Sequence, residues 1–334
     1  MARYEVIEGT GPLGGIILRD SADGAWARII PDIGANCVEL YLPNPDGSLA
    51  QVLYPPPSRE ALQSHPAHFG TPILFPFPNR IAHGRYTFQG QTYQLRVHDQ
   101  GNAIHGLVID QPFQITARNV NDESATLTCT ISSSNLVQVD GFPFPFTFTV
   151  TFTLDLNGLT LTAQAVNTGN SPMPLGYGLH PYFPLPMSPQ GTRDHCMILL
   201  PVTERWLLDS NLIPTSDRQR LTATEDLLTL QPLGNRQFDG VFTGVLRDTD
   251  GWTRARYTDP SAGRTIIISG DHYIREWVLY TPPTAPAISF EPYTCTTNAF
   301  NLDEHGINAG RTVLDPNQIW HCIVSFSTER FDRF

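Results

Sequence analysis

The stretch FTFTVTFTLDLNGLTLTAQAV, at residues 146–166, decides the fold class of this 334-residue chain. Apolar side chains occupy the even positions of residues 146–156 and mostly threonine the odd ones, and Leu, Leu, Ala and Ala alternate through residues 159–166. Successive side chains of a β-strand point to opposite faces, so this alternation predicts two half-buried strands. The Asn157-Gly158 pair between them is a strong signal for a tight hairpin turn. We therefore predict an antiparallel β-hairpin.

Strand patterns recur along the chain, whereas helix patterns are scarce. A weaker hairpin is expected in residues 85–95 around Gln89-Gly90, and a short helix in residues 58–64 with Ser58 as its N-cap. Further strands are expected at residues 113–120, 125–132, 265–269, 277–280 and 319–327.

Turn-forming residues complete the prediction of the fold. The 29 prolines and 26 glycines divide the chain into short segments, and no helix-length pattern separates the strands. The expected fold is all-β, with a single large antiparallel β-sandwich domain over residues 1–334. Two large sheets would pack face to face, and a concave sheet face or the loops at one rim would carry the site.

Composition excludes several classes of function. The formal net charge is −11, from 32 acidic and 21 basic residues, which argues against nucleic acid as a partner. All 21 basic residues are arginine, so neither a P-loop nor a Schiff-base enzyme is possible. No apolar run approaches the ~18 residues of a membrane span, and the first residues lack the apolar core of a signal peptide. We expect a cytoplasmic protein without a membrane partner, as a monomer or a homodimer.

Several sequence motifs of catalysis are absent. The five cysteines are widely separated and form no CxxC pair, which is typical of free thiols in a reducing cytoplasm, and no arginine stands next to any of them. There is no GxSxG motif, and no GxGxxG is expected after a strand. His65 and His68 are separated by a proline outside any helix pattern, so no metal site is expected there. Cofactor-free acid–base chemistry remains.

Two segments rich in proline and aromatic residues carry an acid–base pair. LGYGLHPYF (residues 175–183) contains His180, and ISFEPYTCTTNAFN (residues 288–301) contains Glu291. A proline follows each of the two and disfavours the α conformation, so both are expected to be extended, at strand ends or in loops. A histidine and a carboxylate are sufficient to move a proton on and off a substrate. A buried structural pair is the alternative.

Three further polar residues are candidates for the same site. Arg80 follows the apolar run in GTPILFPFPNRIAHG and is either ion-paired in the core or directed at ligand hydroxyls. His105 in NAIHGL is either a satisfied core histidine or a site residue, and Gly106 would allow close approach of a ligand to the backbone. Asp239 in FDGVF either forms a turn or contributes to function.

Taken in order, these motifs resemble those of the aldose 1-epimerases, or galactose mutarotases. The matching motifs are NRI (79–81), HG (105–106), GYGLHPYF (176–183), FDGVF (238–242), and FEPYT with NAFN (290–301). The resemblance implies a single-domain antiparallel β-supersandwich that interconverts the α and β anomers of a free monosaccharide. It also implies that the reaction needs no cofactor and no metal.

The resemblance also assigns roles to residues. Glu291 matches the general base, His180 the general acid and His105 a second active-site histidine. The residues expected to bind the sugar are Arg80, Asp239 and Asn79. Glu291 would take the proton of the C1 hydroxyl while His180 gives one to the ring oxygen. We expect the ionised carboxylate to raise the pKa of His180 above its ordinary value of ~6.5.

The expected substrate is an unphosphorylated aldose such as glucose or galactose. A hexose-6-phosphate 1-epimerase is the alternative enzyme, and it would need two arginines at one end of the pocket, for which Arg85 and Arg275 are candidates. A non-catalytic sugar-binding protein on the same fold is the alternative from a different class.

Overall fold

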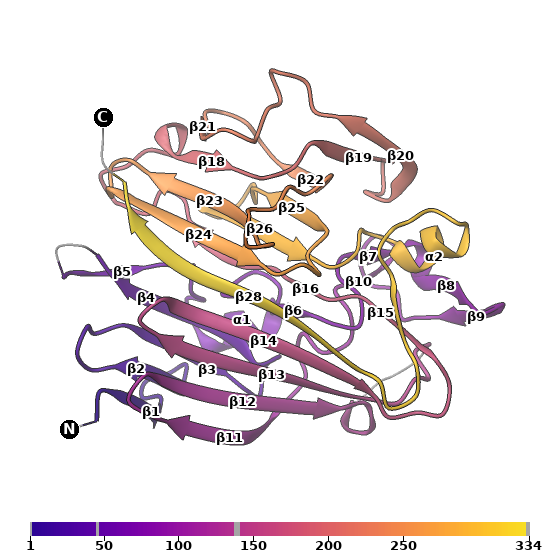
Figure 1. The fold of residues 1–334 in the computed structure, drawn as a ribbon, viewed down its shortest axis with the longest axis horizontal. Coiled ribbons are helices and arrows are strands. Elements are labelled where there is room, and N and C mark those ends of the chain that lie inside the picture. The colour runs from indigo at the N-terminus through magenta and orange to yellow at the C-terminus, as the bar shows by residue number, and fades with distance from the viewer. Residues whose placement is uncertain (1, 45–46, 137–140, 332–334) are drawn as a thin grey trace.

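The computed structural model describes residues 2–44, 47–136 and 141–331, and β-strands dominate it (Figure 1). The strands form three large sheets, of five, nine and eight strands, and three two-stranded ribbons. Neighbouring strands in the largest sheet are antiparallel throughout, as in the β13–β14 and β24–β28 ladders. The all-β antiparallel fold is therefore confirmed. The single-domain organisation stays a prediction.

The nine-stranded sheet contains the predicted hairpin. β13 (Phe146–Asp155) and β14 (Gly158–Asn167) pair residue by residue along their whole length, and the apolar side chains of β13 are buried. The other strands, in order across the sheet around this pair, are β11 (Gln114–Val120), β12 (Ser124–Ser132), β28 (Ile319–Arg330), β24 (Arg264–Gly270), β23 (Thr253–Asp259), β18 (Met197–Leu199) and β21 (Gln231–Pro232).

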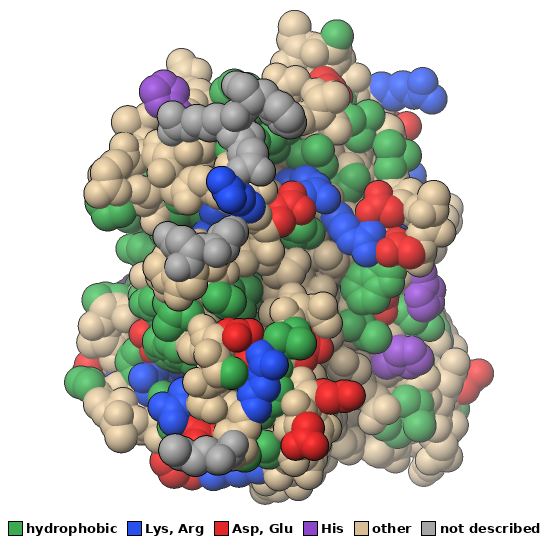
Figure 2. All heavy atoms as spheres, turned by 60° about the vertical axis from the view of Figure 1, so that its left-hand side comes forward, with side chains coloured by type: hydrophobic (Ala, Val, Ile, Leu, Met, Phe, Trp, Pro, Cys, Tyr) green, Lys and Arg blue, Asp and Glu red, His purple; other side chains and the backbone are tan. Residues whose placement is uncertain are grey.

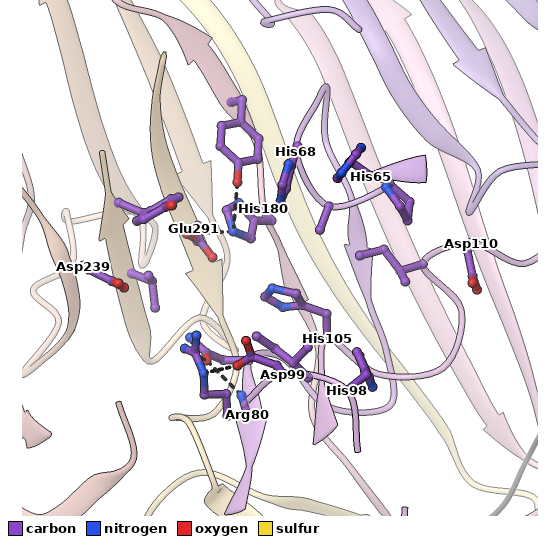
Figure 3. Close-up of a pocket in the computed structure, with 18 of the residues that line it drawn as sticks. His65, His68, Arg80, His98, Asp99, His105, Asp110, His180, Asp239 and Glu291 are labelled. Atoms are coloured by element: carbon purple, nitrogen blue, oxygen red, sulfur yellow. Dashed lines mark hydrogen bonds and ion pairs between the residues drawn. The ribbon is translucent and has the colours of Figure 1, made fainter. Parts of the chain in front are cut away.

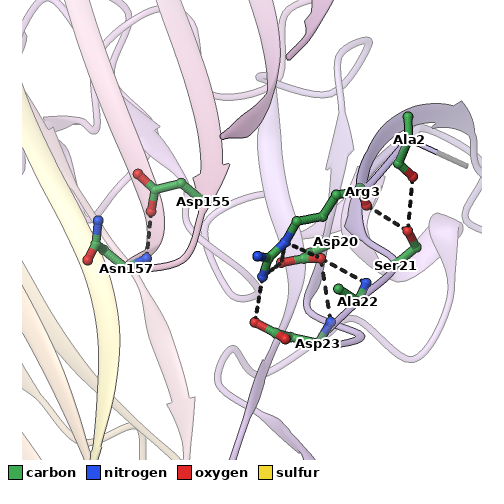
Figure 4. Close-up of polar contacts among 8 residues, drawn as sticks. All are labelled: Ala2, Arg3, Asp20, Ser21, Ala22, Asp23, Asp155 and Asn157. Atoms are coloured by element: carbon green, nitrogen blue, oxygen red, sulfur yellow. Dashed lines mark hydrogen bonds and ion pairs between the residues drawn. The ribbon is translucent and has the colours of Figure 1, made fainter. Parts of the chain in front are cut away.

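The turn of this hairpin begins one residue earlier than predicted. Leu156 and Asn157 form it, and Gly158 is already the first residue of β14, paired with Asp155. The backbone N–H of Asn157 donates to the Asp155 carboxylate at 2.7 Å (Figure 4), which closes the turn at this position. Gly158 has a φ of 119°, which a residue with a side chain adopts with difficulty.

The second predicted hairpin is confirmed. β8 (Arg85–Phe88) and β9 (Gln91–Gln94) pair across Gln89 and Gly90, whose φ angles of 51° and 77° match a type I′ turn. The other ribbons are β7 (Arg80–Ile81) with β10 (Ala103–Ile104), and β15 (Met173–Leu175) with β27 (Thr312–Leu314).

The one predicted helix is present, and a second helix, α2, was not predicted. α1 (Arg59–Ser64) begins as expected at Ser58, whose hydroxyl accepts the Ala61 N–H at 3.2 Å. α2 (Ala299–Glu304) lacks that signal, because its N-cap Asn298 is left-handed and its side chain accepts from Ala82 instead. Three 3₁₀ turns are η1 (Ala82–Gly84), η2 (Ser133–Asn135) and η3 (Arg193–His195).

The five-stranded sheet was not expected. It contains, in order, β1 (Tyr4–Glu8), β2 (Ile16–Asp20), β3 (Trp26–Ile30), β4 (Asn36–Pro43) and β5 (Leu49–Gln51). Most of its buried apolar side chains join the same hydrophobic core as those of the two larger sheets, whereas Ile30 and Val38 lie in a smaller separate cluster. Arg3 ties the start of β1 to Asp20 and Asp23 through ion pairs of 2.7 and 2.8 Å (Figure 4).

The loop between β1 and β2 contradicts the prediction that no GxGxxG motif follows a strand. Its sequence GTGPLG, at residues 9–14, fits GxGxxG and follows a strand, contrary to expectation. The loop leads into antiparallel β2, with Gly9 N–H bonded to Gly15 O at 2.8 Å, and no helix follows it. A dinucleotide site needs a helix N-terminus at this point, so the loop provides none.

The eight-stranded sheet carries the candidate site. Its strands in order are β20 (Pro214–Arg220), β19 (Glu204–Leu208), β22 (Asp239–Thr243), β25 (Glu276–Tyr280), β26 (Ala287–Tyr293), β16 (Gly178–Leu179) and β6 (Ile73–Leu74), and β17 (Tyr182–Pro184) also pairs with β26. Ile288 and Phe290 of β26 lie in the main core. Because side chains alternate across a strand, Ser289, Glu291 and Tyr293 face the other side of the sheet.

On the face in Figure 2, arginine side chains lie next to acidic ones and form no patch of a single sign. Ion pairs at the protein surface, such as Arg254–Asp250 and Arg256–Glu329, join side chains of opposite charge. No helix in the described part of the chain is long and apolar enough to cross a membrane.

Candidate active site

A cavity of about 660 Å³ lies on the sheet face that carries Glu291 (Figure 3). This volume is within the usual range of small-molecule sites, roughly 300–1,000 Å³. The cavity brings together segments that are far apart in the sequence. Its lining includes all six site residues predicted from the sequence, which are Asn79, Arg80, His105, His180, Asp239 and Glu291.

The acid–base pair occupies the floor of this cavity. His180 directly follows β16, and its backbone N–H donates to Pro72 O at 3.0 Å, whereas Glu291 lies within β26. The His180 Nε2 and Glu291 Oε1 atoms are 3.3 Å apart, and both side chains are at least nine-tenths buried. Both residues are extended or at a strand end, as the prolines after them predicted.

Ser289 fixes the orientation and the tautomer of His180. Its hydroxyl donates to Pro181 O at 2.8 Å and lies 3.0 Å from His180 Nδ1. A hydroxyl has a single hydrogen, so with that hydrogen on Pro181 O it is the imidazole that donates, from Nδ1 to Ser289 Oγ. The other ring nitrogen, Nε2, is then the one that exchanges protons toward Glu291.

Tyr293 supports Glu291 in a comparable way. Its hydroxyl donates to the Oε2 atom of Glu291, and both side chains are fully buried. Neither Ser289 nor Tyr293 was singled out from the sequence. The sequence offered one signal for them, which is the two-residue period of a β-strand. Residues 289, 291 and 293 of one strand lie on the same face of the sheet.

Burial moves both pKa values of the pair toward the neutral forms. Loss of hydration lowers the pKa of His180 to about 3 and raises the pKa of Glu291 well above its ordinary value, against the opposing effect of the Tyr293 hydroxyl. The expectation that the carboxylate raises the pKa of His180 is therefore wrong, because burial of the imidazole outweighs the attraction. With Nδ1–H fixed, one proton is shared between Oε1 and Nε2.

Arg80 lines the opposite side of the cavity and is ion-paired there. Its Nε donates to Asp99 Oδ2 at 2.6 Å and its Nη1 to Asn79 Oδ1 at 3.2 Å. Asn79 has a left-handed backbone, with φ of 53°, and its carbonyl accepts the His105 N–H at 2.9 Å. Arg80 is therefore ion-paired, and its contact with ligand hydroxyls stays a prediction. Asp99 was missed, because nothing in its local sequence marks it.

His105 lies beside His180, with the two ring centroids 5.3 Å apart. Its Nδ1 atom is buried and has no hydrogen-bonding partner among the described residues, and burial lowers its pKa well below the ordinary value. The expected role of Gly106 is wrong. The backbone that approaches it is that of Phe75, whose carbonyl would lie 2.3 Å from an added Cβ and accepts the Leu107 N–H at 2.8 Å.

Asp239 and two tyrosines complete the walls of the cavity. Asp239 is the first residue of β22, pairs with Tyr280 of β25, and faces the cavity (Figure 3). Burial there raises the pKa of its carboxyl group. Tyr182 stacks on the His180 ring at 4.7 Å, and its hydroxyl lies 3.5 Å from Nε2. Neither Tyr182 nor Tyr280 was predicted to be a site residue.

Two groups of residues considered from the sequence lie elsewhere. Arg275 donates to Asn308 at 2.9 Å, and neither it nor Arg85 lines the cavity. All five cysteines are buried without disulfides, and burial raises the thiol pKa, to about 12 for Cys129 and about 11 for Cys196. Such thiols are poor nucleophiles.

A family model described as aldose 1-epimerase matches residues 21–327 of this sequence. The chain belongs to the aldose 1-epimerase family. This membership supports an isomerase that acts on a sugar, and it agrees with the resemblance of the motifs.

The sequence identities to individual relatives are low. The uncharacterized protein YihR of Escherichia coli K12 is 28% identical over 241 residues, which are 70% of this chain and 72% of that protein. An aldose 1-epimerase of the same organism is 32% identical over 51% of this chain, and the match spans only 47% of that enzyme. A galactose mutarotase-like protein from Clostridium acetobutylicum superposes with a TM-score of 0.88 at 23% identity, over 98% of this chain and 99% of that one.

Proposed function

We propose that this protein interconverts the α and β anomers of an unphosphorylated aldose by opening and closing the sugar ring. The observation that carries the proposal is the His180–Glu291 pair, 3.3 Å apart on the floor of a cavity large enough for a pyranose. Two groups that can each exchange a proton with one small molecule meet the requirement of general acid–base catalysis.

The reaction begins from the form of the pair with its shared proton on His180. Glu291 takes the proton of the C1 hydroxyl while His180 Nε2 gives its proton to the ring oxygen. The C1–O bond of the ring breaks, and a carbonyl forms at C1. Rotation about the C1–C2 bond and the reverse transfers close the ring on the other face. No proton, electron or group is gained or lost overall.

Burial of the pair supports these transfers. A carboxylate with a raised pKa is a stronger base than usual, and an imidazolium with a lowered pKa is a stronger acid. Ring opening leaves Glu291 protonated and His180 neutral, which is the form that burial favours. In this step Glu291 gains a proton and His180 loses one, and burial favours both of these changes.

The charges around the cavity support an unphosphorylated substrate. Arg80 is the only arginine among the described lining residues, and Asp99 already pairs with it. Three more carboxyl groups line the cavity, which are Asp110, Asp239 and Glu291. A sugar phosphate would meet this acidic surface without a second arginine, so the hexose-6-phosphate alternative lacks the feature that it requires.

Saturation-transfer NMR of anomer exchange tests the proposal with glucose and galactose. Wild-type protein should exchange the anomers far above the buffer rate, and His180→Ala and Glu291→Gln should each lower the rate by about 10²–10⁴-fold while the protein stays folded. Sugar binding without exchange above the buffer rate would contradict the proposal and favour a non-catalytic sugar-binding protein. A loss under about tenfold in Glu291→Gln would show that another group is the base.

A further inference from the structure

The ion pair between Arg80 and Asp99 occupies the one arginine found among the described residues that line the catalytic cavity (Figure 3). Arg80 Nε donates to Asp99 Oδ2 at 2.6 Å. Both side chains are largely buried, with 15% of the arginine and 24% of the aspartate exposed. Water and salt screen such a pair less than a pair at the protein surface. The charge of Asp99 therefore acts strongly on that of Arg80.

The backbone holds both partners of this ion pair in place. Arg80 belongs to β7, where its N–H donates to Asn79 Oδ1 at 2.9 Å and its carbonyl accepts the Asn298 N–H at 2.8 Å. Asp99 lies in the turn before β10, where its N–H donates to Asn102 O at 3.1 Å and its carbonyl accepts the Asn102 N–H at 2.8 Å. Asn102 is itself buried. The pair is thus positioned before a ligand enters.

The guanidinium of Arg80 keeps donors for a ligand in spite of this pairing. Its Nη1 donates to Asn79 Oδ1 at 3.2 Å, whereas Nη2 has no hydrogen-bonding partner in the part of the chain that the structure describes. Nη2 can therefore donate to the hydroxyl groups of a sugar. A carboxylate binds arginine most strongly through two parallel N–H groups and the opposite charge. Asp99 already takes the Nε–H and balances the charge.

Carboxyl groups outnumber this arginine in the lining of the cavity. Asp110, Asp239 and Glu291 line it together with Asp99. The ion pair lies within electrostatic reach of Asp239, because burial raises the pKa of that carboxyl group while the charge of Arg80 lowers it and the charge of Asp99 raises it. A carboxylate on the sugar would meet like charges here, and like charges placed together exclude a ligand.

We infer that Asp99 is a specificity-determining residue, which leaves Arg80 open to sugar hydroxyl groups and closed to a carboxylate. The site would then accept neutral aldoses and reject uronic acids. This inference rests on the proposed anomer exchange and narrows its substrate class. A uronic acid differs from its parent aldose only at C6, where a carboxylate replaces the CH₂OH group. Loss of the Asp99 charge would leave the charge of Arg80 unbalanced and admit the anion.

The test compares kcat/KM for anomer exchange within two matched pairs, glucose with glucuronate and galactose with galacturonate. Saturation-transfer NMR at about pH 8, above the ordinary histidine pKa, supplies the rates. Wild type should prefer the neutral sugar of a pair by about a hundredfold or more. Asp99→Asn removes the charge and keeps the size of the side chain, so it should raise kcat/KM for the uronate itself by about tenfold to a hundredfold. A purely structural defect would lower both values.

Asp110→Asn is the matched control, because it removes the same charge from the same cavity and Asp110 forms no ion pair within the described residues. It should leave the preference for the neutral sugar near that of wild type. The double variant Asp99→Asn/Arg80→Met should lose the gain with the uronate, since the gain depends on the arginine.

Three results would overturn the inference. They are no gain for the uronate in Asp99→Asn, an equal gain in Asp110→Asn, and a gain that persists without Arg80. A wild-type protein that exchanges a uronate as fast as its neutral partner would also overturn it, and this measurement needs no variant to fold. Absence of exchange with all four sugars would instead overturn the proposed function itself.

Discussion

Replacement of Tyr293 by phenylalanine tests how the protein controls the proton that His180 and Glu291 share. The substitution removes one oxygen atom, whose hydrogen bond to Glu291 Oε2 stabilises the carboxylate and lowers its pKa. Without this bond the shared proton should move from His180 to Glu291. The form of the pair that starts ring opening then becomes rarer.

The size of the effect follows from the kind of hydrogen bond. A bond to a charged group contributes about 1.5–3 kcal/mol, and about 1.4 kcal/mol corresponds to a tenfold change in an equilibrium. The active form should therefore fall by about tenfold to a hundredfold, and kcat/KM should fall with it. Both forms of the pair hold the same number of protons, so raising the pH should not recover the loss.

The assay is kcat/KM for anomer exchange of glucose as a function of pH, with thermal melting to confirm that the variant folds. Tyr177→Phe is the matched control, because this tyrosine is also fully buried and its hydroxyl has no hydrogen-bonding partner among the described residues. An unchanged kcat/KM in Tyr293→Phe would refute the reasoning. A loss that high pH reverses would show that Glu291 acts without sharing a proton with His180.

Three further predictions concern the groups around the pair. Ser289→Ala removes the acceptor of the His180 Nδ1–H, so kcat should fall by about tenfold with little change in KM, and an unchanged kcat would contradict the assigned tautomer. Arg80→Ala should mainly raise KM, and a wild-type KM would show that Arg80 does not hold the sugar. Because burial lowers the pKa of His180 to about 3, the pair gains a second proton only near that pH. The value of kcat/KM should therefore stay level from about pH 7 to about pH 5, and a half-loss near the ordinary histidine pKa of ~6.5 would contradict this.

The strands and the main site residues could be predicted because their signals are local. Alternation in residues 146–166 defines a hairpin without reference to the rest of the chain, and the Gln89-Gly90 turn needs only its own backbone angles. The prolines after His180 and Glu291 restrict their neighbours in the same local way. The pairing of these two side chains in one cavity came from the resemblance of motifs, and the structure agrees with it.

The features that were missed depend on contacts between distant segments. Asp99 meets Arg80 because β7 pairs with β10, which brings the loop before β10 to the cavity. Helix α2 begins at a left-handed Asn298, whose side chain accepts from the Ala82 N–H and the Asn301 side chain rather than from a backbone N–H of its own helix. The lowered pKa of His180 is a consequence of complete burial, and burial is decided by the whole fold.

The double variant His180→Ala/Glu291→Gln, compared with the two single variants, tests most directly whether the pair acts as one catalytic unit. Residues that act as a unit have strongly non-additive effects on the rate. For glucose anomer exchange, we predict that the double variant loses about as much kcat/KM as either single variant alone. Losses that multiply, so that the double variant falls by the product of the two single effects, would contradict the shared proton on which the mechanism depends.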